Sequence, residues 1–261
     1  MTKVSILLSL CGVIGCASGD KFLVPDSVDR VPEPQDVILM PRNQSPSTRP
    51  VLVFLHGRAS SATECAQALG DLADALQCVV FVPCASTKLG VRKEDGEPVY
   101  EWDTSAPGKV ADRIEAFLRT SPQLDGQHVY LGGVSMGGNM ALLVGLERPR
   151  VFRGIVSCSG YLNAWQRWST SKTKLGEARS RLPILVIHGL EDPNVPCEEG
   201  RQVAQFFAKK GFATRLETFN GGHQLPHGFA GELKSAFAWF DDTNSGLHKP
   251  IDQGAKAVRG E

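Results

Sequence analysis

The chain has 261 residues, of which 42% are hydrophobic and 21% are charged, and these proportions suit one globular domain with a sizeable buried core. Lys and Arg number 28, and Asp and Glu also number 28, so the formal net charge is zero. The chain has no excess of positive charge of the kind that binds nucleic acid, and we expect no nucleic-acid partner.

The first residues have the pattern of an export signal. Lys3 precedes an apolar run over residues 4–15, which is too short to span a membrane and suits the hydrophobic region of a signal peptide. Residues 13–16, with the sequence VIGC, resemble the cleavage box of bacterial lipoproteins, in which the cysteine becomes the lipidated first residue. Three interpretations stay open: a chain lipid-anchored at Cys16, a soluble secreted or periplasmic chain cut after Ser18, and a cytoplasmic protein.

Residues 19–50 are rich in proline, and we expect a tether with one short strand over residues 36–40. Further along the chain, apolar runs alternate with helix-like segments. The runs are continuous and rich in Val, Ile and Leu, which is typical of strands buried on both faces of a parallel sheet. Strands are expected at residues 51–55, 78–82, 128–132, 154–158, 184–187 and 215–219, and helices at residues 62–76, 106–118, 138–147, 198–210 and 231–240.

This alternation predicts an α/β domain over residues 51–241, with a mostly parallel, doubly wound sheet and helices on both faces. Residues 161–181 leave room for a minimal lid, so the site should be open. A signal segment over residues 1–18 precedes the tether, and the polar residues 242–261 are expected to form a C-terminal tail. The seven cysteines form no zinc-binding pattern with each other or with histidine, and no metal site is predicted.

A serine lies in the sharp turn between a predicted strand and a predicted helix. Residues 133–137 read GVSMG, a Gly-x-Ser-x-Gly motif. The motif needs glycine on both sides because larger residues would collide with the strand and the helix. The hydroxyl then stands at the carboxyl end of the sheet near a helix N-terminus, where N–H groups favour a developing anion. Ser135 is therefore the predicted nucleophile; the alternative is a glycine-rich turn without chemistry.

A serine hydroxyl needs a general base, which a carboxylate must orient. In hydrolases that carry the nucleophile in a Gly-x-Ser-x-Gly turn between a strand and a helix, the order along the chain is serine, acid, histidine. His223 follows Asn-Gly-Gly at the end of the strand 215–219, a loop where catalytic groups belong. His227 lies four residues later and is the rival candidate.

The acid should lie in the exit loop of the preceding strand. Asp192 occupies that loop, and Pro193 turns the chain directly after it. The neighbouring Glu191 is the alternative, although we expect it to be a solvated charge.

The oxyanion hole needs two backbone N–H donors. Met136, the residue after the nucleophile, supplies one, and the loop 56–60 after the strand 51–55 should supply the other, from Arg58. The Arg58 side chain is expected to be a solvated surface cation, with contact to the substrate as the alternative. Trp102, Trp165 and Trp168 are candidates to line the site, with ordinary packing as the equal alternative.

With these residues placed, positions 36–241 resemble the phospholipase/carboxylesterase family of the α/β-hydrolase fold, which includes acyl-protein thioesterases. Some likeness extends to secreted esterases of the polyhydroxybutyrate depolymerase and feruloyl esterase type. One departure is Met136, because acyl-protein thioesterases carry glutamine there. The matching motifs are Leu55-His56-Gly57, Tyr100-Glu101-Trp102, residues 133–138, His188-Gly189 with Asp192, Val195-Pro196, and Gly222-His223.

The expected function is a serine hydrolase that cleaves carboxylic esters through a Ser-His-Asp triad and a covalent acyl-enzyme. No cofactor is needed. The substrate would be a small-molecule or lipid-like ester, and membrane contact would come only through an N-terminal lipid anchor. A thioesterase or lysophospholipase with the same triad is one alternative, and a non-catalytic binding protein of hydrolase fold is another.

Overall fold

The structure is a computed structural model that describes residues 22–23, 32–43, 49–121, 124–172 and 175–245. The expected signal segment and most of the expected tail lie outside these ranges. Within them, no helix combines the length and the apolar character that crossing a membrane requires.

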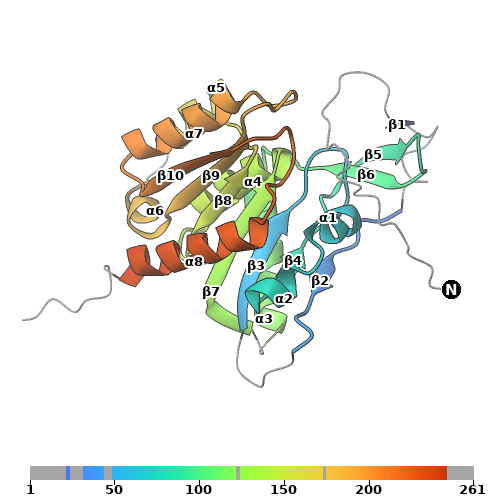
Figure 1. The fold of residues 1–261 in the computed structure, drawn as a ribbon, viewed down its shortest axis with the longest axis horizontal. Helices are drawn as coiled ribbons and strands as arrows, with labels where there is room; N and C mark the ends of the chain where they lie inside the picture. Colours follow the sequence, from blue (N-terminus) through green and yellow to red (C-terminus); the bar gives the residue numbers. More distant parts are fainter. Residues whose placement is uncertain (1–21, 24–31, 44–48, 122–123, 173–174, 246–261) are drawn as a thin grey trace, which may run out of the picture.

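A seven-stranded sheet forms the centre of the molecule, with the strand order β10-β9-β8-β7-β3-β4-β2 (Figure 1). All six strands expected after the tether belong to it, and they pair in parallel. The short strand β2 pairs with β4 in the antiparallel direction and forms one edge. The strands are β2 (Val37–Leu39), β3 (Arg49–Leu55), β4 (Val79–Val82), β7 (Leu124–Val134), β8 (Ile155–Cys158), β9 (Ile184–Gly189) and β10 (Thr214–Phe219).

Helices cover both faces of this sheet, as expected. In Figure 1, α8 and α2 lie over the near face and contact each other, while α3 and α4 contact each other behind the sheet. The helices are α1 (Ala62–Leu69), α2 (Leu72–Leu76), α3 (Pro107–Thr120), α4 (Met136–Glu147), α5 (Ala164–Lys172), α6 (Gly176–Arg181), α7 (Cys197–Lys209) and α8 (Phe229–Ser245).

Aromatic side chains join the helices to the buried strands. Phe54 on β3 meets Phe229 of α8 edge to face, with ring centroids 5.8 Å apart. Phe81 on β4 stacks on Phe117 of α3 at 3.9 Å. Burial of each such side chain contributes about 2–3 kcal/mol, so these contacts lock both helix layers onto the sheet.

Several element boundaries differ from the expectations. The single helix expected over residues 62–76 is two helices, because Gly70 adopts a positive φ of 53° and ends α1. Helix α8 continues through Ser245, so the first residues of the expected tail, from 242 onward, are helical. The segment 161–181, expected to hold only a short lid, contains α5 and α6.

A second, smaller sheet was not expected. It consists of β1 (Phe22–Leu23), β5 (Thr87–Arg92) and β6 (Pro98–Glu101) in the order β1-β5-β6, with antiparallel pairing. Its strands are short and carry Lys, Arg, Gly and Glu, so they lack the apolar runs that revealed the central strands. This small sheet is joined to the loop after β3 by backbone hydrogen bonds of Tyr100 in β6.

Candidate active site

The parallel strands bring the predicted site residues to one edge of the central sheet. Ser135 directly follows β7, Asp192 lies in the loop after β9, and His223 lies in the loop after β10. Since β8 separates β7 from β9, and β10 is next to β9, the three residues come from nearby positions along the carboxyl edge. This is the edge at which open α/β sheets bind ligands.

Ser135 has the backbone conformation of a strained turn. Its φ is 56° and its ψ is −123°, and it immediately precedes the first residue of α4. A Cβ atom at Gly133 would overlap the carbonyl of Gly137, and a Cβ atom at Gly137 would overlap the carbonyl of Leu55. Glycine is therefore required at both positions by close backbone approach, which is the reason the motif predicted.

A short hydrogen bond joins the side chains of His223 and Asp192. Nδ1 of His223 lies 2.7 Å from Oδ2 of Asp192, and both side chains are fully buried. The other Asp192 oxygen accepts the backbone N–H groups of Asn194 and Val195, each at 2.9 Å. Burial opposes ionisation of Asp192, but the hydrogen bonds from Val195, His223 and Asn194 outweigh it and hold the pKa of this carboxyl below its ordinary value.

This arrangement defines which nitrogen of His223 is available for proton transfer. A carboxylate can only accept, so Nδ1 carries the proton and Nε2 has the lone pair. Nε2 is buried and has no hydrogen-bond partner among the described residues, and the same is true of the Ser135 hydroxyl. The structure thus joins His223 to Asp192 but not to Ser135. Hydrogen bonds of this kind are often long in unliganded enzymes and tighten with substrate.

The rival candidates lie in different surroundings. His227 and Glu191 are exposed, whereas His223 and Asp192 are buried. His188 is also buried, and its Nε2 lies 2.8 Å from the carbonyl oxygen of Val195. Burial lowers the pKa of His188, which keeps its ring neutral beside the loop that carries Asp192.

The buried side chain of His56 supports the loop after β3. Burial lowers the pKa of His56 to about 4, so its ring is neutral. Nδ1 contacts the Gly57 carbonyl at 2.7 Å, and Nε2 accepts the N–H of Ala85 at 2.9 Å. Trp102 is buried and donates its indole N–H to the His56 carbonyl at 2.7 Å. Trp102 therefore supports the loop from the core side.

Two expectations about this region need correction or restriction. The Arg58 side chain is not simply solvated, because its Nε donates to Glu101 at 2.7 Å and its exposed fraction is 40%. No local sequence pattern marks this ion pair, because the two residues are 43 positions apart. Trp165 on α5 is 63% exposed, and the side chain of Trp168 lies outside the described part of the chain.

The predicted oxyanion donors come from two different elements. Met136 is the first residue of α4, where backbone N–H groups have no partner within the helix. Arg58 lies in the loop after β3, which is the neighbour of β7 in the sheet. The described residues contain no group of three or more His, Cys, Asp or Glu side chains that could hold a metal ion.

Comparisons with known proteins agree with this architecture. The sequence profile of the family described as phospholipase/carboxylesterase matches residues 40–239. Acyl-protein thioesterase 1 from Gibberella zeae is 35% identical over 98 residues, which are 37% of this chain and 41% of that protein. Acyl-protein thioesterase 1 from Mycosarcoma maydis is 26% identical over 196 residues, which are 65% of this chain and 80% of that protein.

Solved structures resemble the fold at lower identity. Acyl-protein thioesterase 2 from Zea mays has a TM-score of 0.59 and 20% identity, and the match covers 81% of this chain and 99% of that chain. The predicted α/β-hydrolase fold is confirmed. Because the family profile covers most of the length of the chain, the protein belongs to the phospholipase/carboxylesterase family.

Proposed function

We propose that this protein is a serine hydrolase that cleaves carboxylic esters through a covalent acyl-enzyme. One observation carries the proposal: a buried His223–Asp192 pair and a buried, strained Ser135 lie at the same edge of the sheet. The two side-chain atoms that would exchange a proton, Ser135 Oγ and His223 Nε2, are buried atoms without a partner among the described residues. Buried polar atoms are rarely left unpaired without a functional reason.

The proposed reaction has two balanced halves. Ser135 Oγ forms a bond to the acyl carbon while His223 Nε2 accepts its proton, and Asp192 stabilises the imidazolium. The carbonyl electrons move to oxygen, and the N–H groups of Arg58 and Met136 hold that oxyanion. The bond to the alcohol breaks, and His223 protonates the departing oxygen. A water molecule then repeats the attack with the same base, and the acid product leaves as Ser135 regains its proton.

The names of the similar proteins support a second candidate, thioester cleavage, since all three proteins named above are acyl-protein thioesterases. Both bonds are cleaved by the same steps, and the difference is the leaving group. We favour oxygen esters because Met136 stands where the resemblance to thioesterases predicts glutamine. Matched ester and thioester substrates with the same acyl group separate the candidates, and a higher kcat/KM for the thioester would reverse the preference.

A fluorophosphonate probe tests the proposal directly. It should label the wild-type protein at Ser135, while Ser135→Ala should lose labelling and lower kcat by about 10⁴ or more. Chromogenic esters of increasing acyl length then give the substrate preference. Labelling that persists in Ser135→Ala would contradict the assignment, and a protein without labelling or turnover would favour the non-catalytic alternative.

The sequence of residues 3–16 supports a further part of the proposal, which concerns location. An exported, lipid-anchored chain would act on extracytoplasmic esters of small molecules or lipids. These residues lie outside the described structure, so the proposal depends on the sequence pattern alone.

A further inference from the structure

The loop that carries Arg58 is bound along its length to strand β6 of the small sheet. The N–H of Ala59 donates to the carbonyl of Tyr100 at 3.0 Å, and the N–H of Tyr100 donates to the carbonyl of Ser60 at 2.9 Å. The Arg58 side chain bonds Glu101, the next residue of β6. The loop therefore gains a strand-like partner outside the central sheet.

The loop needs such a partner because its backbone is strained. Ala59 has a φ of 57°, in the left-handed region that residues with a Cβ atom rarely adopt. Such conformations persist only where the surrounding contacts over-determine them, and they cluster at functional sites. Ala59 directly follows Arg58, so its backbone angles affect the direction in which the peptide groups of the loop point.

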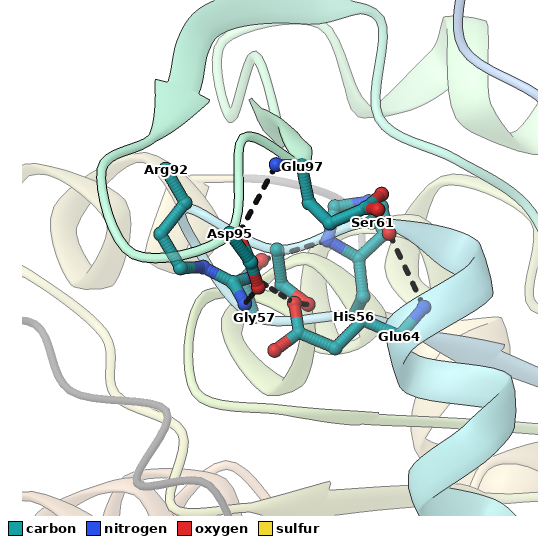
Figure 2. Close-up of polar contacts among 8 residues, drawn as sticks. His56, Gly57, Ser61, Glu64, Arg92, Asp95 and Glu97 are labelled. Atoms are coloured by element: carbon teal, nitrogen blue, oxygen red, sulfur yellow. Dashed lines mark hydrogen bonds and ion pairs between the residues drawn. The ribbon is translucent and has the colours of Figure 1, made fainter. Parts of the chain in front are cut away.

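A second set of ionic contacts ties the small sheet to the start of α1. In Figure 2 the side chain of Arg92 of β5 points toward the carboxylates of Glu64 and Asp95, which it contacts at 2.6 Å and 2.9 Å. Glu64 lies in the first turn of α1 and also accepts the Ser60 hydroxyl at 2.8 Å. The Glu64 carboxylate thereby joins the β5–β6 hairpin to the end of the loop that carries Arg58.

We propose that Glu101 is a positioning residue for the oxyanion hole. By binding the Arg58 guanidinium, Glu101 holds the Arg58 backbone N–H at the distance and angle that the oxyanion requires, and the β1-β5-β6 sheet is the brace for this loop. The inference rests on the proposed function, because the oxyanion forms only if Ser135 attacks an acyl group. The Glu101 side chain acts through Arg58 and does not touch the substrate.

Glu101 is the most informative position in this brace. Tyr100 binds the loop through its backbone, which a substitution leaves in place, and the side chains of Tyr100 and Trp102 are both buried, so changes there would disturb folding. Glu101 has an exposed fraction of 26%, and a glutamine of the same size fits in its place. Partly exposed ion pairs contribute little to global stability, so the fold should survive their loss.

The test is kinetic and uses the full-length protein. Removal of one oxyanion donor costs about 10²–10³ in kcat, so a donor that is only misaligned should cost about 10-fold. Glu101→Gln should therefore lower kcat about 10-fold with KM changed less than 2-fold, because the oxyanion exists only in the transition state. The Ki of an aryl boronic acid, which forms a tetrahedral anionic adduct with Ser135, should rise by the same factor.

Two further variants distinguish positioning from a general structural effect. Arg58→Met removes the same ion pair but keeps the backbone N–H, and it should match Glu101→Gln, with no added loss in the double variant. Glu101→Asp should recover part of kcat. Asp71→Asn breaks an ion pair with Arg42, in which both side chains are 79% exposed, and should leave kcat unchanged.

The outcomes separate failure of the brace from failure of the proposed function. If the wild type and Glu101→Gln are labelled equally by the fluorophosphonate and have equal kcat and boronate Ki, the positioning role is wrong and the serine hydrolase stands. A rise in KM that accounts for the whole effect, or additive losses in the double variant, would also overturn it. If the wild type shows neither labelling nor turnover, the proposed function itself fails.

Discussion

His223 and His227 lie four residues apart in the segment that leads to α8, but only His223 is buried against a carboxylate. We expect His223→Ala to lose nearly all activity, since His223 makes the short 2.7 Å bond to Asp192, whereas Nε2 of His188 lies 3.4 Å from Asp192 and contacts the Val195 carbonyl at 2.8 Å. His227→Ala is the matched control and should retain most activity in the same ester assay. Full activity in His223→Ala, or inactivity in His227→Ala, would mean that His227 and not His223 is the general base.

Asp192 and Glu191 form a second matched pair of neighbours. Asp192→Asn keeps the shape of the side chain but removes the charge that stabilises the imidazolium, so kcat should fall by about 10²–10⁴. Glu191→Gln changes an exposed charge and should alter kcat less than 2-fold, within the range of surface substitutions. Steady-state kinetics on both variants provide the check, and a larger loss at Glu191 would refute the choice of Asp192.

His56 should make the protein sensitive to acid. Its pKa is about 4 in the folded protein and 6.5 in the unfolded chain, because burial disfavours the charged ring. Between these values the unfolded state binds more protons, so stability should fall as the pH is lowered from 6.5 to 4, by about 3 kcal/mol at 1.36 kcal/mol per pKa unit.

Urea unfolding at a series of pH values measures this dependence. A His56→Gln variant should be less stable at pH 7 but should lose less stability on acidification, because glutamine does not titrate. An unchanged slope in that variant would assign the acid sensitivity to other groups.

At the scale of elements, helix α2 ends in a way that the sequence does not favour. Gln77 occupies the left-handed conformation, with a φ of 51° and a ψ of 40°, and its N–H bonds the last turn of the helix. Glycine is the preferred residue in this conformation. Gln77→Gly should raise the free energy of unfolding by about 0.5–1 kcal/mol. The gain is reduced by the stability lost with the hydrogen bond from the Gln77 side chain to the Asp74 carbonyl.

Thermal unfolding of three proteins tests this expectation. Gln77→Ala loses the same side-chain bond but keeps the Cβ atom, so it should be no more stable than the wild type. A Gln77→Gly protein less stable than Gln77→Ala would show that relief of backbone strain does not govern stability at this position.

The elements that were predicted correctly share one property, which is a continuous apolar run or a clear amphipathic period. β4 is buried at every residue, and all of its residues are Val or Phe, so the pattern alone identifies it. In β5 only Gly90 is buried, the burial does not alternate, and Thr, Lys, Gly and Arg stand where apolar residues would mark a strand. Its strand conformation comes from pairing with β1 and β6, which are distant or polar segments that no local pattern reveals.

For the molecule as a whole, the export proposal predicts a lipid at Cys16. Expressed in a bacterial host, the wild type should partition with membranes and carry a lipid mass on Cys16, since several acyl chains together resist dissociation. Cys16→Ser should lose both properties. Intact-mass analysis is the measurement, and a soluble chain that begins at residue 1 or 2 would mean that residues 1–18 are not an export signal.

The sequence by itself determined the family, the order of the central elements and the candidate nucleophile, and it favoured His223 over His227 as the base and Asp192 over Glu191 as the acid. These follow from local patterns: Gly-x-Ser-x-Gly between a strand and a helix, and polar residues directly after apolar runs. The close approach of Gly133 to the Gly137 carbonyl shows why the motif can be read locally, because the backbone within the motif fills the space that a side chain would need.

Only the tertiary structure decided which neighbours are buried and which pairs touch. Burial separates His223 from His227 and Asp192 from Glu191, and it depends on residues far away in the chain. The Arg58–Glu101 ion pair joins positions 43 residues apart, across a small sheet without an apolar signature. Such contacts arise from packing between elements, and the periodicity of any one segment does not predict them.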